Sequence, residues 1–333
     1  MMARRLVVCC DGTWNTPEKD NVTNVVSVAR ALKPRDDRGN HQVVFYDWGL
    51  GTGNFLDRLV GGAAGKGLDR NIRDAYRFLV HNYLPGDRIY LLGFSRGAYT
   101  VRSLVGFIRN CGLLKKPHSG RILEAFEIYR SSSPALHPNA SAARGFTVRY
   151  SRPVSIRFLG VWDTVGALGI PINSRRRRAR YEFHDTRLSS IVDHAYHALA
   201  IDERRKLFAP TIWTTRAGRR HTVQTWFAGV HTDVGGGYPD DHGLADIALE
   251  WMVERAMACG LQFNHATLRA GFDSDSTFLV HDSHRPRYGR RRERAPLETS
   301  RDESIHPTVR DWIDEDVYAP DNLPAGWLNR VES

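Results

Sequence analysis

The chain has 333 residues, 41% of them hydrophobic, so it can bury a large core and disorder is not expected. No stretch comes near the roughly 18 consecutive apolar residues that a membrane-spanning helix needs. The apolar run at residues 6–10 is too short for the core of a signal peptide and lacks a small-residue cleavage site. We therefore expect a cytoplasmic protein whose mature chain starts at residue 1 or 2.

The distribution of charge and cysteine indicates the possible binding partners and the redox compartment of the protein. The formal net charge is +10, and arginines gather at residues 175–180 and 285–294. Such runs are typical of solvated loops, and less often of contacts with an anionic membrane or with nucleic acid. Two of the four cysteines are adjacent and the others are distant (Cys9, Cys10, Cys111 and Cys259). This spacing fits neither a disulfide framework nor a CxxC metal pair, and a reducing compartment fits best.

In chain order, apolar runs rich in β-branched or aromatic residues alternate with segments of helical period. Strands are predicted at residues 5–10, 42–46, 88–94, 154–162 and 222–230. Helices are predicted at residues 22–33, 68–84, 98–111, 122–129, 188–200 and 244–258. This alternation predicts an α/β fold with a mainly parallel sheet and helices on both faces.

The remaining segments suggest one domain over residues 1–333, with a catalytic core at about 4–262. Residues 131–143 are rich in Ser, Pro and Ala and form a predicted linker. Residues 164–187 show no clear period and are interpreted as an excursion or lid, whose arginines would face phosphate headgroups of an anionic membrane. Residues 263–333 are expected to contain only loops and short elements.

A nucleophile motif lies at residues 93–97, which read GFSRG and have the G-x-S-x-G form. The motif stands between a predicted strand and a predicted helix, which is the context that it requires. A sharp strand-to-helix turn would hold Ser95 in a strained backbone conformation, and Gly93 and Gly97 remove side chains that would clash there. Ser95 is therefore the candidate nucleophile.

A serine hydroxyl needs a base and usually a carboxylate to become a good nucleophile. With this motif, the order along the chain is serine, acid and histidine, and the last two follow later strands. Asp163 follows the strand predicted at 154–162, and His231 follows the one predicted at 222–230. The pattern predicts an α/β-hydrolase fold with a triad of Ser95, Asp163 and His231 that cleaves an ester bond through an acyl-enzyme.

Other assignments stay open. Asp163 could be a turn-forming aspartate, and His231 a loop histidine satisfied by local hydrogen bonds. Asp233 is the rival acid. Four other histidines are rival bases (His194, His197, His242 and His306). The first two fall in the helix predicted at 188–200, where a structural role is commoner than a catalytic one.

An acyl-transfer site also needs donors for the oxyanion. One should be the N–H of Arg96, directly after the nucleophile, and the second should come from a loop after an early strand. Gly12 or Thr13 is the candidate second donor, because Gly12 lets the backbone approach a ligand closely. Asp11 supports this loop or simply caps a turn, and Asp233 is a further supporting residue.

Four segments together resemble an α/β-hydrolase domain family that includes the catalytic domains of type VI secretion system phospholipase effectors of the first Tle class. They lie at residues 10–15, 93–98, 161–165 and 229–238. The tail at residues 305–309 and Tyr318 also match, so the resemblance covers nearly the whole chain. It implies a serine hydrolase that uses Ser95, Asp163 and His231 on phospholipid acyl esters, and possible delivery by a secretion system.

Two other functions are weighed against the serine esterase or lipase. A catalytically silent α/β-hydrolase scaffold could bind a protein or an anionic membrane through its basic loops, but such a module needs no intact triad. Nucleic-acid binding is supported by charge alone, since no stacking platform is visible, and we do not expect it. Residues 60–67 fail the phosphate-loop pattern, and no HExxH or paired-cysteine motif occurs, so we predict no cofactor and no metal.

Overall fold

A computed structural model of the chain describes residues 3–12, 22–49, 63–131, 133–136, 140–165, 188–214, 221–239, 241–268, 279–285 and 291–332. Some of the sequence predictions fall on the gaps. Thr13 and nearly all of the proposed lid, with the arginines at 175–180, lie outside the described residues.

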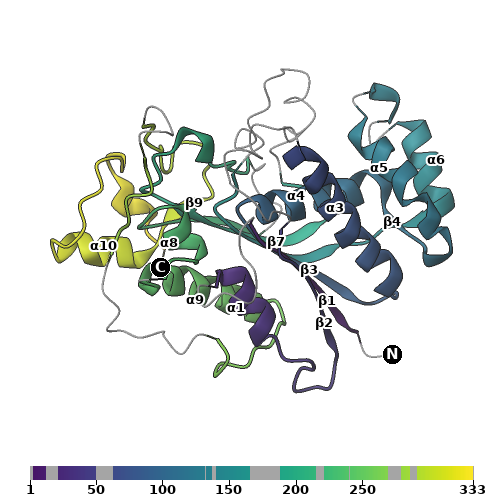
Figure 1. Cartoon of the computed structure of the whole chain (residues 1–333), viewed down its shortest axis with the longest axis horizontal. Coiled ribbons are helices and arrows are strands. Elements are labelled where there is room, and N and C mark those ends of the chain that lie inside the picture. Colours follow the sequence, from purple (N-terminus) through teal and green to yellow (C-terminus); the bar gives the residue numbers. More distant parts are fainter. Residues whose placement is uncertain are drawn as a thin grey trace.

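One parallel sheet forms the centre of the described structure (Figure 1). Its seven strands are, from edge to edge, β2 (Gln42–Asp47), β1 (Arg5–Cys10), β3 (Arg88–Phe94), β6 (Ile156–Trp162), β7 (Val192–Ala200), β8 (His221–Phe227) and β9 (Glu303–Ile305). Every pair of neighbouring strands runs parallel. The predicted mainly parallel α/β fold is therefore confirmed.

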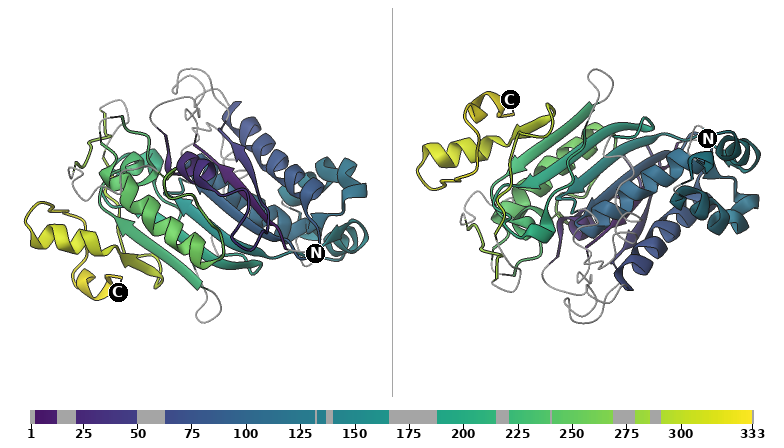
Figure 2. Two further views of the ribbon diagram at one scale, coloured as in Figure 1. Left: turned by 90° about the horizontal axis from the view of Figure 1, so that it is seen from below. Right: turned by 90° about the horizontal axis from the view of Figure 1, so that it is seen from above.

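Helices cover both faces of this sheet (Figures 1 and 2). On one face, α3 (Ala63–Asn82) and α4 (Arg96–Cys111) pack on the sheet, and α5 (Ile122–Arg130) packs against these two helices. Two helices pack on the other face: α1 (Asn24–Ala31) and α9 (Gly243–Ala258). Side chains along β1 point alternately to the two faces of the sheet. Leu6 and Val8 pack in the core beneath α3 and α4, and Val7 packs in the core beneath α1 and α9. This is why the strands read as continuous apolar runs.

Shorter elements lie at the two ends of the molecule, as Figures 1 and 2 show. Near α5, a small antiparallel pair of β4 (Leu113–Leu114) and β5 (Ser151–Arg152) accompanies α6 (Ser141–Tyr150). At the opposite end, α10 (Pro307–Asp314) follows β9. The other elements within the described ranges are α8 (His231–Gly235) and 3-10 turns at Lys116–Arg121, Pro134–Leu136, Lys206–Phe208 and Trp327–Arg330.

The apolar spacing at residues 188–200 predicts a helix, but this prediction is wrong. Residues Val192–Ala200 form β7, which pairs in parallel with β6 and β8. As an inner strand, β7 is covered on both faces, so its buried side chains do not alternate with exposed ones and mimic a helical period. The C-terminal segment also contributes more than expected, because β9 extends the sheet beside β8.

The predicted linker at 131–143 is likewise only partly irregular. It contains the 3-10 turn Pro134–Leu136, and α6 begins at Ser141 and continues to Tyr150. Among the α6 side chains whose burial is described, Ala143 and Phe146 are buried whereas the apolar Val148 is exposed, so the apolar period of this helix is weak in the sequence.

The start of α4 presses directly on the end of β1. A β-carbon built on Gly97 would lie 1.9 Å from the carbonyl oxygen of Cys10 and 2.3 Å from its carbonyl carbon. Backbone atoms cannot rotate away, so only glycine allows the helix to sit this close. Gly145, in α6, has no atom within 4 Å of the same position.

Gly97→Ala should therefore lower the free energy of unfolding by about 2 kcal/mol or more, because the new methyl group overpacks a rigid site. Gly145→Ala should raise it by about 0.5–1 kcal/mol, because alanine has the higher helix propensity and meets open space. Denaturant unfolding followed by circular dichroism measures both changes. Equal effects of the two variants would show that α4 does not rest on β1 as described.

Candidate active site

The ends of adjacent strands meet at one edge of the sheet. The register pairs Cys10 of β1 with Gly93 of β3, and Phe94 of β3 with Trp162 of β6. The N–H of Ser95 donates to the carbonyl oxygen of Trp162 at 3.1 Å. The residues that follow these strands therefore lie side by side at the carboxyl edge, where open parallel sheets place their ligands.

Ser95 occupies a sharp turn between β3 and α4. Its backbone has φ 56° and ψ −117°, a conformation that non-glycine residues rarely adopt. Arg96 is the first residue of α4, so its N–H belongs to the helix start and has no partner within the helix. The strand, turn and helix that the motif requires are all present.

Asp163 lies directly beyond β6, and its side chain is fully buried. Its φ is 38°, so the backbone leaves β6 through a second strained residue. The N–H of Asp163 donates to the carbonyl oxygen of Ala198 on the neighbouring strand at 2.7 Å. The backbone thus fixes the direction of the carboxylate.

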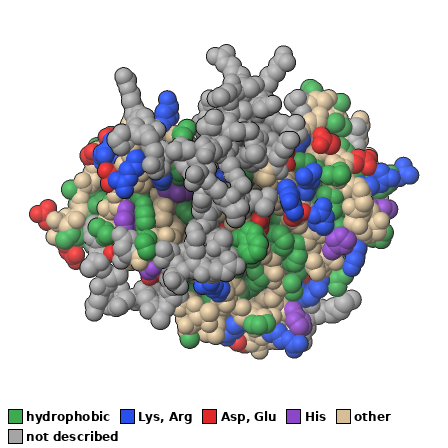
Figure 3. Space-filling view, in the orientation of Figure 1, with side chains coloured by type: hydrophobic (Ala, Val, Ile, Leu, Met, Phe, Trp, Pro, Cys, Tyr) green, Lys and Arg blue, Asp and Glu red, His purple; other side chains and the backbone are tan. Residues whose placement is uncertain are grey.

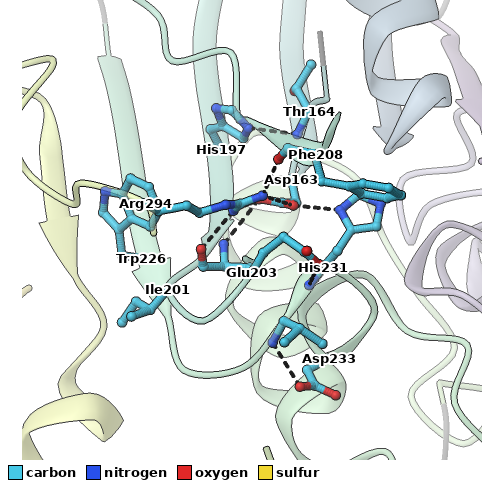
Figure 4. Close-up of polar contacts among 12 residues, drawn as sticks. Asp163, Thr164, His197, Ile201, Glu203, Phe208, Trp226, His231, Asp233 and Arg294 are labelled. Atoms are coloured by element: carbon cyan, nitrogen blue, oxygen red, sulfur yellow. Dashed lines mark hydrogen bonds and ion pairs between the residues drawn. The ribbon is translucent and has the colours of Figure 1, made fainter. Parts of the chain in front are cut away.

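The carboxylate of Asp163 contacts the ring of His231, as Figure 4 shows. His231 Nδ1 lies 2.6 Å from Asp163 Oδ2. Burial alone would raise the pKa of Asp163, but the guanidinium of Arg294 and the hydrogen bond from His231 hold it well below its ordinary value. An ionised Asp163 can accept a hydrogen bond from Nδ1–H of His231.

His231 begins the short helix α8, and the strand before it, β8, ends at Phe227 rather than at residue 230 as expected. Its ring contacts two aromatic rings, with centroids 4.6 Å from Phe94 and 4.9 Å from Phe208. Burial lowers the pKa of His231, Arg205 acts in the same direction, and Asp163 opposes both. Because Phe94 directly precedes Ser95, this packing brings the imidazole to the Ser95 turn.

Arg294 is a member of the site that the sequence did not reveal. Its two terminal nitrogens donate to Asp163 at 2.6 and 2.9 Å (Figure 4). They also donate to the carbonyl oxygens of Ala200 and Phe208. In the sequence it is one arginine of the run at 285–294, where Arg291 and Arg292 are exposed. No local pattern separates it from them, since its partner is 131 residues away.

Glu203 contacts the backbone of His231 and was likewise not predicted from the sequence. Its Oε2 accepts the N–H of His231 at 3.3 Å and the hydroxyl of Ser283 at 3.1 Å. Arg205 binds the same carboxylate through its backbone and its guanidinium. Glu203 therefore anchors the start of α8, from which the imidazole projects.

Asp233, the rival acid, has other partners. Its carboxylate accepts the N–H groups of Val230 and His281 and lies 2.5 Å from His281 Nδ1. The ring of His281 stacks on Tyr238 with centroids 3.8 Å apart. Asp233 thus forms a second carboxylate–imidazole pair next to α8 and fixes the residue that precedes His231.

The four histidines that are rival bases lie in a strand or at the start of a helix. His194 and His197 lie on β7, not on a helix. Burial, together with Arg102, lowers the pKa of His197 to about 3, and its Nε2 accepts the N–H of Thr164 at 3.1 Å. His242 immediately precedes α9. His306 caps α10, accepting the N–H of Thr308, and stacks on Phe227.

The residues that follow β1, Asp11 and Gly12, form hydrogen bonds with each other and with neighbouring side chains. The N–H of Gly12 donates to Asp11 Oδ1 at 2.7 Å. Asp11 Oδ2 accepts the hydroxyls of Thr23 and Tyr46. Asp11 therefore acts as the cap of this turn, and the predicted Gly12 donor is already engaged by its neighbour.

The described residues contain neither a metal-binding cluster nor a membrane-spanning helix. No three acidic, histidine or cysteine side chains among them are grouped so that they could hold a metal ion. None of the helices within the described ranges has the length and apolar character needed to cross a bilayer.

The chain matches a family model and a curated protein. The family model "T6SS, Phospholipase effector Tle1-like, catalytic domain" matches residues 4–255. The uncharacterized protein YEL023C of Saccharomyces cerevisiae is 32% identical over 232 residues, which are 63% of this chain and 33% of that protein.

Two solved structures are also similar. The crystal structure of an uncharacterized protein from Pseudomonas aeruginosa has a TM-score of 0.51 and 20% identity over 81% of this chain and 48% of that chain, which shows a shared fold. The structure of the Tle1 effector bound to the VgrG spike from the Type 6 secretion system has a TM-score of 0.39 and 20% identity over 71% of this chain and 52% of that one. The chain spans between a third and about half of the length of these relatives.

The family model covers most of the chain, including the Ser95 turn and both members of the Asp163–His231 pair. The chain therefore belongs to the Tle1-like catalytic domain family of type VI secretion system phospholipase effectors, a family of hydrolases.

Proposed function

We propose that the chain is a serine hydrolase of phospholipid acyl esters, with Ser95 as nucleophile, His231 as base and Asp163 as acid. The contact of 2.6 Å between His231 and Asp163, at the sheet edge where the Ser95 turn lies, carries this proposal. Family membership supports the phospholipid as the substrate.

The hydrogen bond between His231 and Asp163 determines which ring nitrogen of His231 can act as the base. Because Nδ1 is bound to Asp163, Nε2 is the atom available to take the proton of Ser95. The Ser95 oxygen then forms a bond to the ester carbonyl carbon, and the ester C–O bond breaks as His231 returns the proton to the leaving alcohol. Water repeats the sequence on the acyl-enzyme, releasing the fatty acid and restoring Ser95.

The start of α4 supplies the first oxyanion donor in this mechanism. The N–H of Arg96 follows the nucleophile directly, and the helix dipole favours negative charge at the same place. Gly12 could act as the second donor only by giving up its bond to Asp11. A second donor from Gly12 or Thr13 stays a prediction.

Membrane contact and delivery by a secretion system are proposed on family membership and on the net charge of +10. Described basic and acidic side chains are spread over the face seen in Figure 3 and do not form one basic patch there. The hydrolase proposal therefore depends on the site and not on surface charge.

Ser95→Ala should reduce hydrolysis by about a thousandfold or more, because no other hydroxyl replaces the attacking group. Short and long p-nitrophenyl esters and phospholipid vesicles measure the loss, and a fluorophosphonate probe should label the wild type alone. Faster turnover of the long esters and the vesicles would place the enzyme among lipases.

Ser103→Ala is the matched control, since Ser103 is a buried serine further along α4. It should keep wild-type labelling and turnover. Undiminished activity of a folded Ser95→Ala variant, or a wild type that neither labels nor hydrolyses any of these esters, would contradict the proposal.

The pH dependence follows from the state of His231. Only the neutral imidazole accepts the proton of Ser95, and burial lowers the pKa of His231 below the ordinary 6.5. kcat/KM for a soluble ester should therefore stay on its plateau at pH 7 and fall as the pH decreases through that pKa. A pH–rate profile measures the midpoint, and a value above about 7 would be incompatible with the site described.

A further inference from the structure

The C-terminal segment reaches the candidate site although it lies beyond residues 4–255, which the family model matches. Its Arg294 places both terminal nitrogens on the carboxylate of Asp163. We propose that Arg294 is a positioning residue, which clamps Asp163 in the orientation that His231 needs. This inference rests on the proposed function, because it treats Asp163 as the acid of the triad.

The clamp restrains both oxygens of the carboxylate. Oδ1 accepts Arg294 at 2.6 Å and the N–H of Ala200 at 3.2 Å. Oδ2 accepts Arg294 at 2.9 Å and His231 at 2.6 Å. Two parallel bonds from a planar guanidinium fix the plane of a carboxylate, which a single bond cannot do. The direction of the Asp163–His231 contact is therefore set from the far side by Arg294.

The same guanidinium also holds the surroundings of the imidazole. It donates at 2.7 Å to the carbonyl oxygens of Ala200, at the end of β7, and of Phe208. The ring of Phe208 packs against the ring of His231. Arg294 therefore fixes both the hydrogen-bond partner of His231 and one wall of its packing.

Arg294 is itself anchored by the body of the protein. The side-chain amide of Asn322 donates to the carbonyl oxygens of Arg294 and Ile201. Two residues before Arg294, the N–H of Arg292 donates to the carbonyl oxygen of Arg204. The backbone is thus hydrogen-bonded at Arg294 and two residues before it, which holds the side chain of Arg294 beside Asp163.

A cation at this place also affects the imidazole. Among the described residues, the charged groups near His231 include Asp163 from the end of β6, Glu203 and Arg205 after β7, Asp233 in α8, and Arg294 behind Asp163. Arg294 offsets part of the negative charge of Asp163 that would stabilise an imidazolium. Its removal should therefore raise the pKa of His231, whereas loss of a merely structural ion pair would leave this pKa unchanged.

Arg294→Met should lower kcat for a short p-nitrophenyl ester by about a hundredfold, because a misplaced catalytic group costs about that much. KM should change little, since Arg294 lies behind Asp163, and the acid limb of the pH–rate profile should move to higher pH. Arg294→Lys keeps the charge but loses the fork, so its kcat should be intermediate and its acid limb close to that of the wild type.

Arg292→Met is the control, since it removes the same charge from an exposed position two residues away. It should match the wild type in kcat, KM and acid limb. Guanidinium ion at millimolar concentration should restore part of the activity of Arg294→Ala and should not affect Arg292→Met. An Arg294→Met protein that is less stable to heat, yet keeps wild-type kcat and acid limb while folded, would overturn the proposal.

A direct titration separates this inference from the proposed function. The His231 ring is followed against pH by NMR in histidine-labelled protein, its signal being assigned by its loss in His231→Gln. The midpoint should be higher in Arg294→Met than in the wild type. If the wild type hydrolyses no ester, the proposed function fails, and the titration still decides whether Arg294 controls His231. An unchanged midpoint in a folded Arg294→Met or Arg294→Ala protein would refute the clamp.

Discussion

The site depends on one buried negative charge. Asp163 has no exposed surface, so its carboxylate can stay ionised only if the protein replaces the water that it has lost. The protein does so with Arg294, His231 and the N–H of Ala200, which together satisfy both carboxylate oxygens. These donors come from the C-terminal segment, from α8 and from β7. Neutralising this single charge therefore requires distant parts of the chain to be brought together, and the geometry of the imidazole follows from it.

Close backbone packing is the second constraint. α4 can begin directly beside the end of β1 because Gly97 has no side chain, and this closeness sets where Ser95 leaves β3. Asp163 leaves β6 through a similarly unusual φ. Strain at both residues persists because the parallel sheet holds the strands on either side. The sheet therefore positions the proposed nucleophile and the proposed acid, and the C-terminal segment orients the acid.

The sequence allows some residues of the candidate site and some strands to be predicted, but not others. Ser95 carries a local motif with strand and helix context, and Asp163 directly follows an apolar strand, so local patterns are enough to propose them as candidates. Arg294 and Glu203 could not be identified, because their roles depend on contacts across the fold and their sequence neighbours look the same. β7 was mistaken for a helix because burial on both faces removes the alternation that marks a strand. β9 was missed because a strand of three residues has no period to detect.

Two carboxylate–imidazole pairs lie near α8, and the cation decides how they differ. Asp233 pairs with His281 much as Asp163 pairs with His231. Burial raises the pKa of Asp233, whereas Arg294 and His231 hold the pKa of Asp163 well below its ordinary value despite its burial. Environments that separate the pKa values of similar groups assign them different chemical tasks. In the proposed triad, Arg294 helps to keep Asp163 ionised, so that its carboxylate can orient the imidazole of His231. The pair without Arg294 fixes the backbone of Val230, so that His231 begins α8 in the required place.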